Sequence, residues 1–205
     1  MDAVIDLWQA NAFVSQGIRA IRSDNLLEAK EKFELALTIS QDIDLDKDTV
    51  AMESNPDNAV NSIAARFKVQ GSRYAVSQES PPNSIVDALS DYQDAMKLDP
   101  EIQIYGFQWN QICFFGAIQG ISSEVLPTCE ASVDSAPHHG GYRDSRGLAR
   151  ALTGDTTGAI EDFQAYIAWS GSPPRRKQQR QEWINALQKG ENPFTEDLLK
   201  ELQEQ

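Results

Sequence analysis

The stretch Gly147–Phe163 constrains the fold of this 205-residue chain more than any other feature. It predicts a helix, a tight turn at Gly154-Asp155 and a second helix. Gly147 in the first helix and Ala159 in the second are small residues at positions where two helices would touch, and Phe163 follows Ala159 by one helical turn. This pattern is typical of an antiparallel helix pair packed at close range, because small side chains let two backbones approach.

A recurrence of about 34 residues extends this pattern over most of the chain. Small and aromatic residues return at similar offsets, with Gly17 and Phe33 near the start and Gly147 and Phe163 near the end. The sequence therefore predicts a single domain over 1–205, with repeats at about 7–40, 64–100, 104–137 and 140–173, an acidic connector at 41–57 and a cap at 174–205.

These offsets resemble those of the tetratricopeptide (TPR) repeat, whose proteins are right-handed solenoids of antiparallel helix pairs. The resemblance covers about Leu7 to Pro173, and the residues after it would form C-terminal capping helices with a polar outer face. The expected fold class is therefore all-α. The resemblance implies a scaffold that holds a protein or peptide partner, without a cofactor and without catalytic activity of its own.

Four short segments bear a closer resemblance, to the TPR tails of large bacterial signalling proteins. These segments are Trp109–Cys113, Cys129–Ala131, Arg143–Arg150 and Gly190–Phe194. Such tails are frequent in cyanobacteria and often follow WD40 repeats, NTPase modules or caspase-like modules. The resemblance implies an adaptor that relays binding to an effector, and the chain would be either a stand-alone adaptor or a piece of a larger protein.

In TPR proteins the first helix of each repeat lines a concave groove, and the resemblance assigns two groove positions to each repeat here. The assigned residues are Val14, Ile18, Lys68, Ser72, Asn110, Phe114, Asp144 and Leu148. They lack the set of Lys, Asn and Arg with which some TPR adaptors clamp two carboxylates. An apolar or amphipathic segment suits this groove better, supplied either by a partner or by the chain's own termini.

The net charge bears on the class of partner. The chain has 18 Lys and Arg against 31 Asp and Glu, which gives a net charge of -13. Nucleic acid and anionic membranes are therefore not expected as main partners, since the average surface would repel them. No apolar run approaches the roughly 20 residues of a membrane span, and the N-terminal residues do not read as a secretory signal. The expected location is the cytoplasm.

The two cysteines, Cys113 and Cys129, fall in the first and second helix of one predicted repeat. They are equally far from Ile121, which lies in the expected turn, so an antiparallel pair would bring them face to face. A disulfide needs Cα atoms about 4.4–6.8 Å apart, which only closely packed helices allow. Two interpretations remain open, a disulfide and a pair of reduced, buried thiols that act as small core residues.

Two motifs have some metal-binding character. Four acidic residues of the connector match a calcium-loop spacing, namely Asp42, Asp44, Asp46 and Glu53. The loop needs Gly where Lys47 stands, so a solvated acidic loop is the favoured interpretation. His138-His139 has no further ligand at a suitable spacing and is interpreted as a turn with two solvated imidazoles. Neither a metal site nor a catalytic constellation is predicted, and the chain is not expected to be an enzyme.

Two groups of basic residues each allow two interpretations. Arg143, Arg146 and Arg150 would either present guanidinium groups to an acidic loop or pair within the chain. Their partners would then be Asp144, Glu161 or Asp162. The basic cluster at Arg175–Arg180 would either meet an acidic partner or form the solvated face of the cap.

Besides the scaffold, an oligomerisation module is the main alternative function, since the apolar third repeat could expose a patch to a second copy. An enzyme or small-ligand binder is less favoured.

Overall fold

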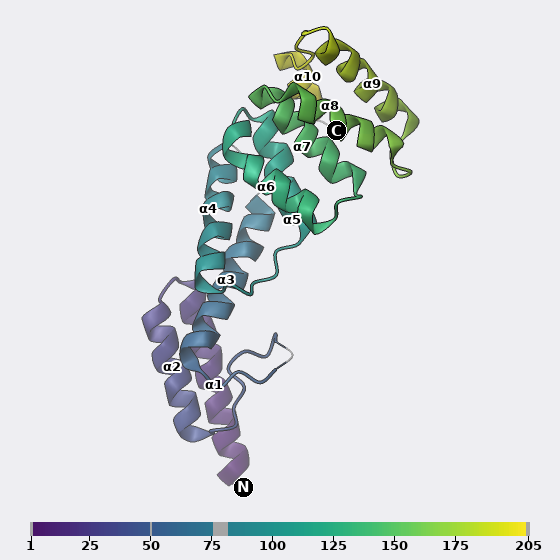
Figure 1. Cartoon of the computed structure of the whole chain (residues 1–205). Coiled ribbons are helices and arrows are strands. Elements are labelled where there is room, and N and C mark those ends of the chain that lie inside the picture. Colours follow the sequence, from purple (N-terminus) through teal and green to yellow (C-terminus); the bar gives the residue numbers. More distant parts are fainter. Residues whose placement is uncertain (1, 50, 76–81, 204–205) are drawn as a thin grey trace. The chain divides into compact units, whose positions relative to one another are not determined.

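A computed structural model describes residues 2–49, 51–75 and 82–203 (Figure 1). Over these residues the chain forms ten α-helices and no strand. The helices are α1 Asp2–Arg22, α2 Leu26–Ile39, α3 Pro56–Ala75, α4 Pro82–Leu98, α5 Gly106–Ile118, α6 Ser122–Ser135, α7 Gly140–Thr153, α8 Thr156–Ala168, α9 Pro174–Gln188 and α10 Glu196–Gln203. Helices adjacent in the chain pack as pairs, with α1 on α2, α5 on α6 and α7 on α8. The expected all-α fold is confirmed.

The chain divides into two compact units, whereas the sequence predicts a single domain. Unit 1 comprises residues 1–71 and 91–102, and unit 2 comprises residues 72–90 and 103–205. The boundaries fall inside α3 and α4, so each of these helices contributes residues to both units. Each unit is described by itself below.

Unit 1 has an apolar core that draws on the acidic connector as well as on helices. Phe33 of α2 is fully buried, and Ile43 and Leu45 of the connector belong to the same cluster. The connector is therefore a packed segment and not the solvated loop that the sequence predicts. Its carboxylates satisfy its own backbone: Asp44 Oδ1 accepts hydrogen bonds from the backbone N–H groups of Asp46 (3.1 Å) and Glu53 (3.0 Å). This local use of the Asp44 carboxylate resembles a turn cap.

In each of three helix pairs, two residues with the same sequence separation meet where the two helices cross. A Cβ atom on Gly17 of α1 would lie 2.3 Å from the Phe33 ring of α2, and one on Gly147 of α7 would lie 2.9 Å from the Phe163 ring of α8. These positions need glycine, because a side chain there would overlap the ring. The close packing that the sequence predicts for 147–163 is confirmed.

In α5 and α6 this crossing is occupied by the two cysteines, whose sequence separation is also 16. The structure joins Cys113 and Cys129 by a disulfide, with their Cα atoms 4.9 Å apart, and both residues are fully buried. Close approach of the two helix backbones accounts for this distance, which lies inside the range that a disulfide needs. The same separation thus accommodates either a Gly–Phe contact or a Cys–Cys bond.

A count of free thiols tests this disulfide. The denatured, non-reduced protein is expected to show no reactive thiol, and two after reduction. Reduction opens a loop of about 15 residues and should lower the free energy of unfolding by about 3 kcal/mol. Two reactive thiols without reductant would contradict the bond. Because disulfides are rare in the reducing cytosol, the same count on protein isolated from its host also tests the expected cytoplasmic location.

Side-chain caps explain where several helices begin. Asn55 Oδ1 accepts from the backbone N–H of Asp57 at 2.9 Å, directly before the helix that starts at Pro56. Asp155 Oδ1 accepts from Gly158 N at 2.9 Å and starts α8. The turn before Asp155 is closed by a left-handed residue, Gly154, with φ of 92°. The predicted turn at Gly154-Asp155 is therefore confirmed, with a chemical reason for both residues.

The C-terminal cap is built around an aromatic cluster. Phe194 is buried beside Trp183 of α9, with ring centroids 5.0 Å apart, and Trp183 lies 5.4 Å from Phe163 of α8. Beyond Phe194, Thr195 Oγ1 accepts a hydrogen bond from Leu198 N at 3.3 Å and caps the start of α10. Among the helices described, none is both long enough and apolar enough to cross a membrane.

Candidate interaction cleft

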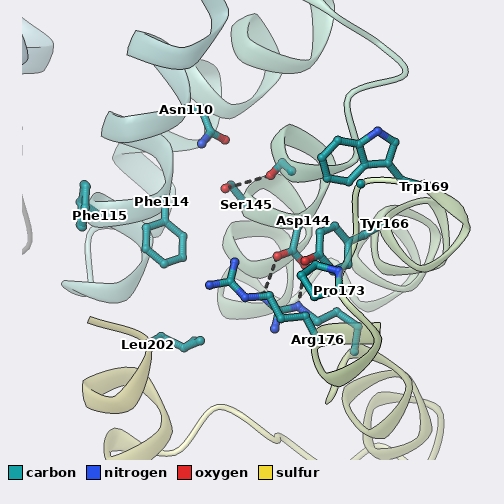
Figure 2. Close-up of a pocket in the computed structure, with 13 residues that line it drawn as sticks. Asn110, Phe114, Phe115, Asp144, Ser145, Tyr166, Trp169, Pro173, Arg176 and Leu202 are labelled. Carbon is teal, nitrogen blue, oxygen red and sulfur yellow. Dashed lines mark hydrogen bonds and ion pairs between the residues drawn. The ribbon is translucent and has the colours of Figure 1, made fainter. Parts of the chain in front are cut away.

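Unit 2 contains a cleft of about 460 Å³. It is lined by α5, α7, the segment from α8 to α9, and α10. The lining residues are Asn110, Phe114, Phe115, Gly141, Asp144, Ser145, Tyr166, Trp169, Gly171, Pro173, Arg176, Arg180 and Leu202. Figure 2 shows Phe114, Phe115 and Leu202 on one side of this space and Tyr166 and Trp169 on the other. The walls are therefore largely aromatic and aliphatic.

A buried ion pair forms part of the cleft wall. Arg180 of α9 donates from Nε to Asp144 Oδ1 at 2.8 Å and from Nη2 to Oδ2 at 2.6 Å. The guanidinium lies 4.2 Å from the centroid of the Trp183 ring, and the residue is only 3% exposed. Burial raises the pKa of the Asp144 carboxyl above its ordinary value, while the Arg180 hydrogen bonds oppose that rise. The sequence allows Arg180 either a solvated face or a contact with an acidic partner; the structure buries it, with its charge paired to Asp144.

Two lining groups remain available to a ligand. Arg176 is exposed at the cleft and forms no ion pair with another described residue. The side-chain oxygen of Asn110, Oδ1, is buried and accepts no hydrogen bond from any residue the structure describes. A buried acceptor without a donor costs free energy, so a donor from a bound segment would be stabilising there.

Three of the predicted groove residues come together in this cleft. Asn110 and Phe114 of α5 and Asp144 of α7 line it from neighbouring first helices. Leu148, one turn after Asp144, is only 2% exposed and belongs to the core of unit 2. It therefore offers no surface to a partner.

The other predicted groove residues have separate environments. Ile18 lines a second cleft, in unit 1, together with Arg66 and Phe67. Val14 and Ser72 are buried, at 3% and 2% exposure. The Lys68 ammonium lies 3.4 Å from the Asp91 carboxylate, so its charge is already paired. These four residues are not in the cleft lined by Asn110, Phe114 and Asp144.

About half of the lining residues come from segments that the sequence does not assign to the groove. Tyr166, Trp169 and Arg176 lie after the first helix of the last repeat, and Leu202 lies in the predicted cap. The assignment used first helices only, so it missed them. A signal for Leu202 was present, since Leu198, Leu199 and Leu202 form the apolar face of an otherwise charged helix.

The arginines of α7 form an internal charge network. Arg146 donates from Nε and Nη2 to the two oxygens of Asp162, at 2.8 and 2.7 Å, and from Nη1 to Glu130 at 2.6 Å. Arg150 donates to the same two carboxylates, at 3.0 Å to Asp162 and 2.8 Å to Glu130. Asp162 is 1% exposed. The hydrogen bonds that Arg146 donates to Asp162 are the main reason why the pKa of Arg146 lies above its ordinary value.

This network decides between the two interpretations of the α7 arginines. Arg146 is buried, and its charge is matched by Asp162, one of the partners that the sequence suggests. Glu130 of α6 was not anticipated. The network joins α6, α7 and α8 and leaves Arg146 no surface to offer an acidic loop.

His139 is packed at the start of α7. His139 caps α7, with Nδ1 accepting from Tyr142 N at 3.3 Å, and its ring centroid lies 5.0 Å from that of Trp169. It is therefore packed, in contrast to the solvated turn that the sequence predicts. Within the residues searched, no group of three His, Cys, Asp or Glu side chains is arranged to hold a metal ion.

No protein-family model matches the chain, and no curated protein matches it.

Proposed function

We propose that the chain is a helical-repeat scaffold of the TPR type that holds a segment of a protein partner in the cleft of unit 2. The observation that carries the proposal is the convergence of Asn110, Phe114 and Asp144, three residues assigned to a binding groove before their positions were known. They lie on successive first helices, as the residues of a repeat groove do. The proposed effect of binding is to bring the partner to an effector, without chemistry by the scaffold.

The repeated crossing supports the TPR assignment. Gly17 with Phe33, Cys113 with Cys129, and Gly147 with Phe163 have the same sequence separation, and each pair meets across two consecutive helices. A shared spacing with a shared contact is expected when one supersecondary unit is repeated. The three pairs therefore favour a common repeat unit over three unrelated helix pairs.

The chemistry of the cleft favours a peptide over a reaction. Its walls are aromatic and aliphatic, and its polar groups are few, which suits an apolar segment whose backbone supplies hydrogen bonds. Asp144 and Arg180 already neutralise each other, so neither stands ready for proton transfer. Neither histidine lines the cleft. A small ligand would also fit this volume, but the cleft lacks a charge constellation suited to catalysis.

A pull-down from the native host tests the proposal. The variant Phe114→Asp places a charge in the cleft and should weaken capture of a specific partner by about tenfold or more, as loss of an aromatic anchor does. Phe107→Asp is the matched control: it changes the same residue type on the same helix, at a position 41% exposed and outside the cleft lining. Circular dichroism checks that both variants fold. Partners that survive Phe114→Asp would refute the proposed groove.

Self-association is the second candidate, and one observation favours it. Tyr105 and Phe107, at the start of α5, are 57% and 41% exposed, with their rings stacked at a centroid distance of 6.0 Å. Exposed aromatic pairs of this kind are common at protein interfaces. Sedimentation of the wild type and of Phe107→Asp distinguishes this candidate, since a homo-oligomer formed there should dissociate in the variant.

A further inference from the structure

The geometry points to α10 as an internal competitor for the cleft, and to an acidic amphipathic helix as the segment that the partner supplies. This inference rests on the proposed function and specifies the partner and its regulation. Three features of unit 2 carry it: how α10 is seated, how weakly it is held, and which charge the cleft leaves unmatched.

One leucine of α10 takes a place in the cleft. Leu202 is 2% exposed and lines the same space as Phe114, and the two are seen together in Figure 2. The helix packs on α5, and Gln203 Nε2 lies at hydrogen-bonding distance, 3.5 Å, from the carbonyl oxygen of Ile118. The chain's own C-terminal helix thus occupies part of the groove, which is one of the two occupants that the sequence analysis left open.

The attachment of α10 is slight compared with that of the residues before it. Phe194 is fixed between aromatic rings of α8 and α9, whereas Leu202 is the only residue of α10 that is fully buried. Leu198 and Leu199 are half-buried. A helix of eight residues is unstable by itself in water, so α10 depends on its tertiary contacts, of which the burial of Leu202 is the main apolar one. It can therefore leave the cleft while Phe194 keeps the cap in place.

The cleft carries a positive charge that α10, as seated, leaves unpaired. Of its three charged lining residues, Asp144 and Arg180 cancel each other and Arg176 remains unpaired among the residues described. The chain as a whole has a net charge of -13, so a positive cleft is a local exception. α10 has acidic residues in its first turn and leucines on its apolar face. A partner helix with leucines on its apolar face and an acidic residue placed opposite Arg176 would meet both the aromatic walls and that charge.

The space left beside Leu202 indicates that the partner helix buries more than α10 does. The cleft has a volume of about 460 Å³ with Leu202 already in its wall. α10 places one leucine fully there, while a longer helix could insert further apolar side chains against Tyr166 and Trp169. A partner that makes more of these contacts can displace α10.

Tethering makes α10 a strong competitor in spite of its few contacts. A segment joined through a short linker acts at an effective concentration of about millimolar. A free helix with the same contacts must overcome that concentration, so its apparent affinity for the intact chain is reduced. Removing the Leu202 contact should therefore increase the affinity of the cleft for a helix added in solution.

The test uses the full chain and a fluorescein-labelled peptide with the sequence of residues 191–205, followed by fluorescence anisotropy. Leu202→Asp in the protein should lower the Kd for the wild-type peptide at least about tenfold relative to the wild-type protein. A peptide that itself carries Leu202→Asp should not bind. Leu202→Ala in the protein is a milder release variant, and circular dichroism verifies that both variants fold.

Two charge-reversal variants test whether the segment that binds the cleft is acidic. In the Leu202→Asp protein, Arg176→Glu should weaken peptide binding and remove most of its salt dependence. Arg175→Glu changes an exposed neighbour on the same helix that does not line the cleft, and it should have a smaller effect. Equal effects of the two variants would overturn the assignment of an acidic segment.

The outcomes separate this inference from the proposed function. If both release variants bind the peptide no better than the wild type, α10 is not a competitor and the inference fails. If partner capture in the host is then still lost in Phe114→Asp, the proposed scaffold function stands without it. If capture survives Phe114→Asp, the proposed function fails, whatever the peptide does.

Discussion

Replacing Asp162 by Asn is expected to lower the free energy of unfolding of unit 2 by about 3–5 kcal/mol. The Asp162 side chain is 1% exposed and accepts hydrogen bonds from both Arg146 and Arg150. The isosteric amide keeps the shape but removes the negative charge, so Arg146 is left with Glu130, and Arg150 with Glu130 and the more distant Asp155. A buried charge without its partner is far more costly than a surface charge, because water cannot reach it.

Urea denaturation followed by tryptophan fluorescence measures this effect, since three of the four tryptophans, Trp109, Trp169 and Trp183, lie in unit 2. Asp134→Asn, an exposed change on α6, is the control and should shift the free energy by less than about 0.5 kcal/mol. The double variant Arg146→Met with Asp162→Leu removes both charges and should recover much of the loss. If Asp162→Asn is as stable as Asp134→Asn, the buried charge of Asp162 does not stabilise unit 2 through the two arginines.

Replacing Phe163 by Ala is expected to cost about 3–5 kcal/mol of unit 2 stability. The ring is fully buried, packs against Gly147, and lies 5.4 Å from the Trp183 ring and 6.3 Å from the Phe194 ring. Its removal leaves a cavity at the point where α7, α8 and the C-terminal cap meet. The same urea denaturation measures the loss, and Phe107→Ala, at an exposed ring, should cost less than about 1 kcal/mol.

A second substitution shows whether the contact between Gly147 and Phe163 is the cause. In the wild type, Gly147→Ala should destabilise by about 1–3 kcal/mol, because its Cβ would lie 2.9 Å from the Phe163 ring. In the Phe163→Ala protein the same change fills part of the cavity and adds helix propensity of about 1 kcal/mol, so it should stabilise. The same sign in both backgrounds would refute the contact as the origin of the close packing.

Local rules were sufficient to predict the helices. The turn at Gly154-Asp155 and the start of α10 at Thr195 follow from capping chemistry that acts within a few residues. The prediction of a solvated acidic connector was wrong because the burial of this segment depends on residues distant in the sequence. Leu45 packs in the core of unit 1, and Asp46 pairs with Arg66 of α3. A segment rich in charged residues is predicted to be exposed to solvent unless the residue that pairs with its buried charge is known.

The sequence predicted only part of the cleft lining. The TPR resemblance assigned Asn110, Phe114 and Asp144 to a groove, and these three residues line the cleft, whereas Leu148, one turn after Asp144, is buried in the core. Leu202 lies on the apolar face of α10, which is a local signal of its burial, whereas its place beside Phe114 depends on a tertiary contact. A usable signal for the charge network did exist: Glu130 and Asp162 each lie 16 residues from Arg146, the spacing already seen at the helix crossings.

The network of Glu130, Arg146, Arg150 and Asp162 bears on how unit 2 comes apart. Repeat proteins commonly lose helices one after another from an end, since each repeat contacts only its neighbours. In unit 2, unfolding of α8 would remove Asp162, a carboxylate partner of both Arg146 and Arg150. Unfolding of α6 would remove their other shared partner, Glu130. Partly unfolded forms are therefore penalised more than the sum of their lost apolar contacts, and α6, α7 and α8 should exchange their slowest amide hydrogens in a single cooperative opening.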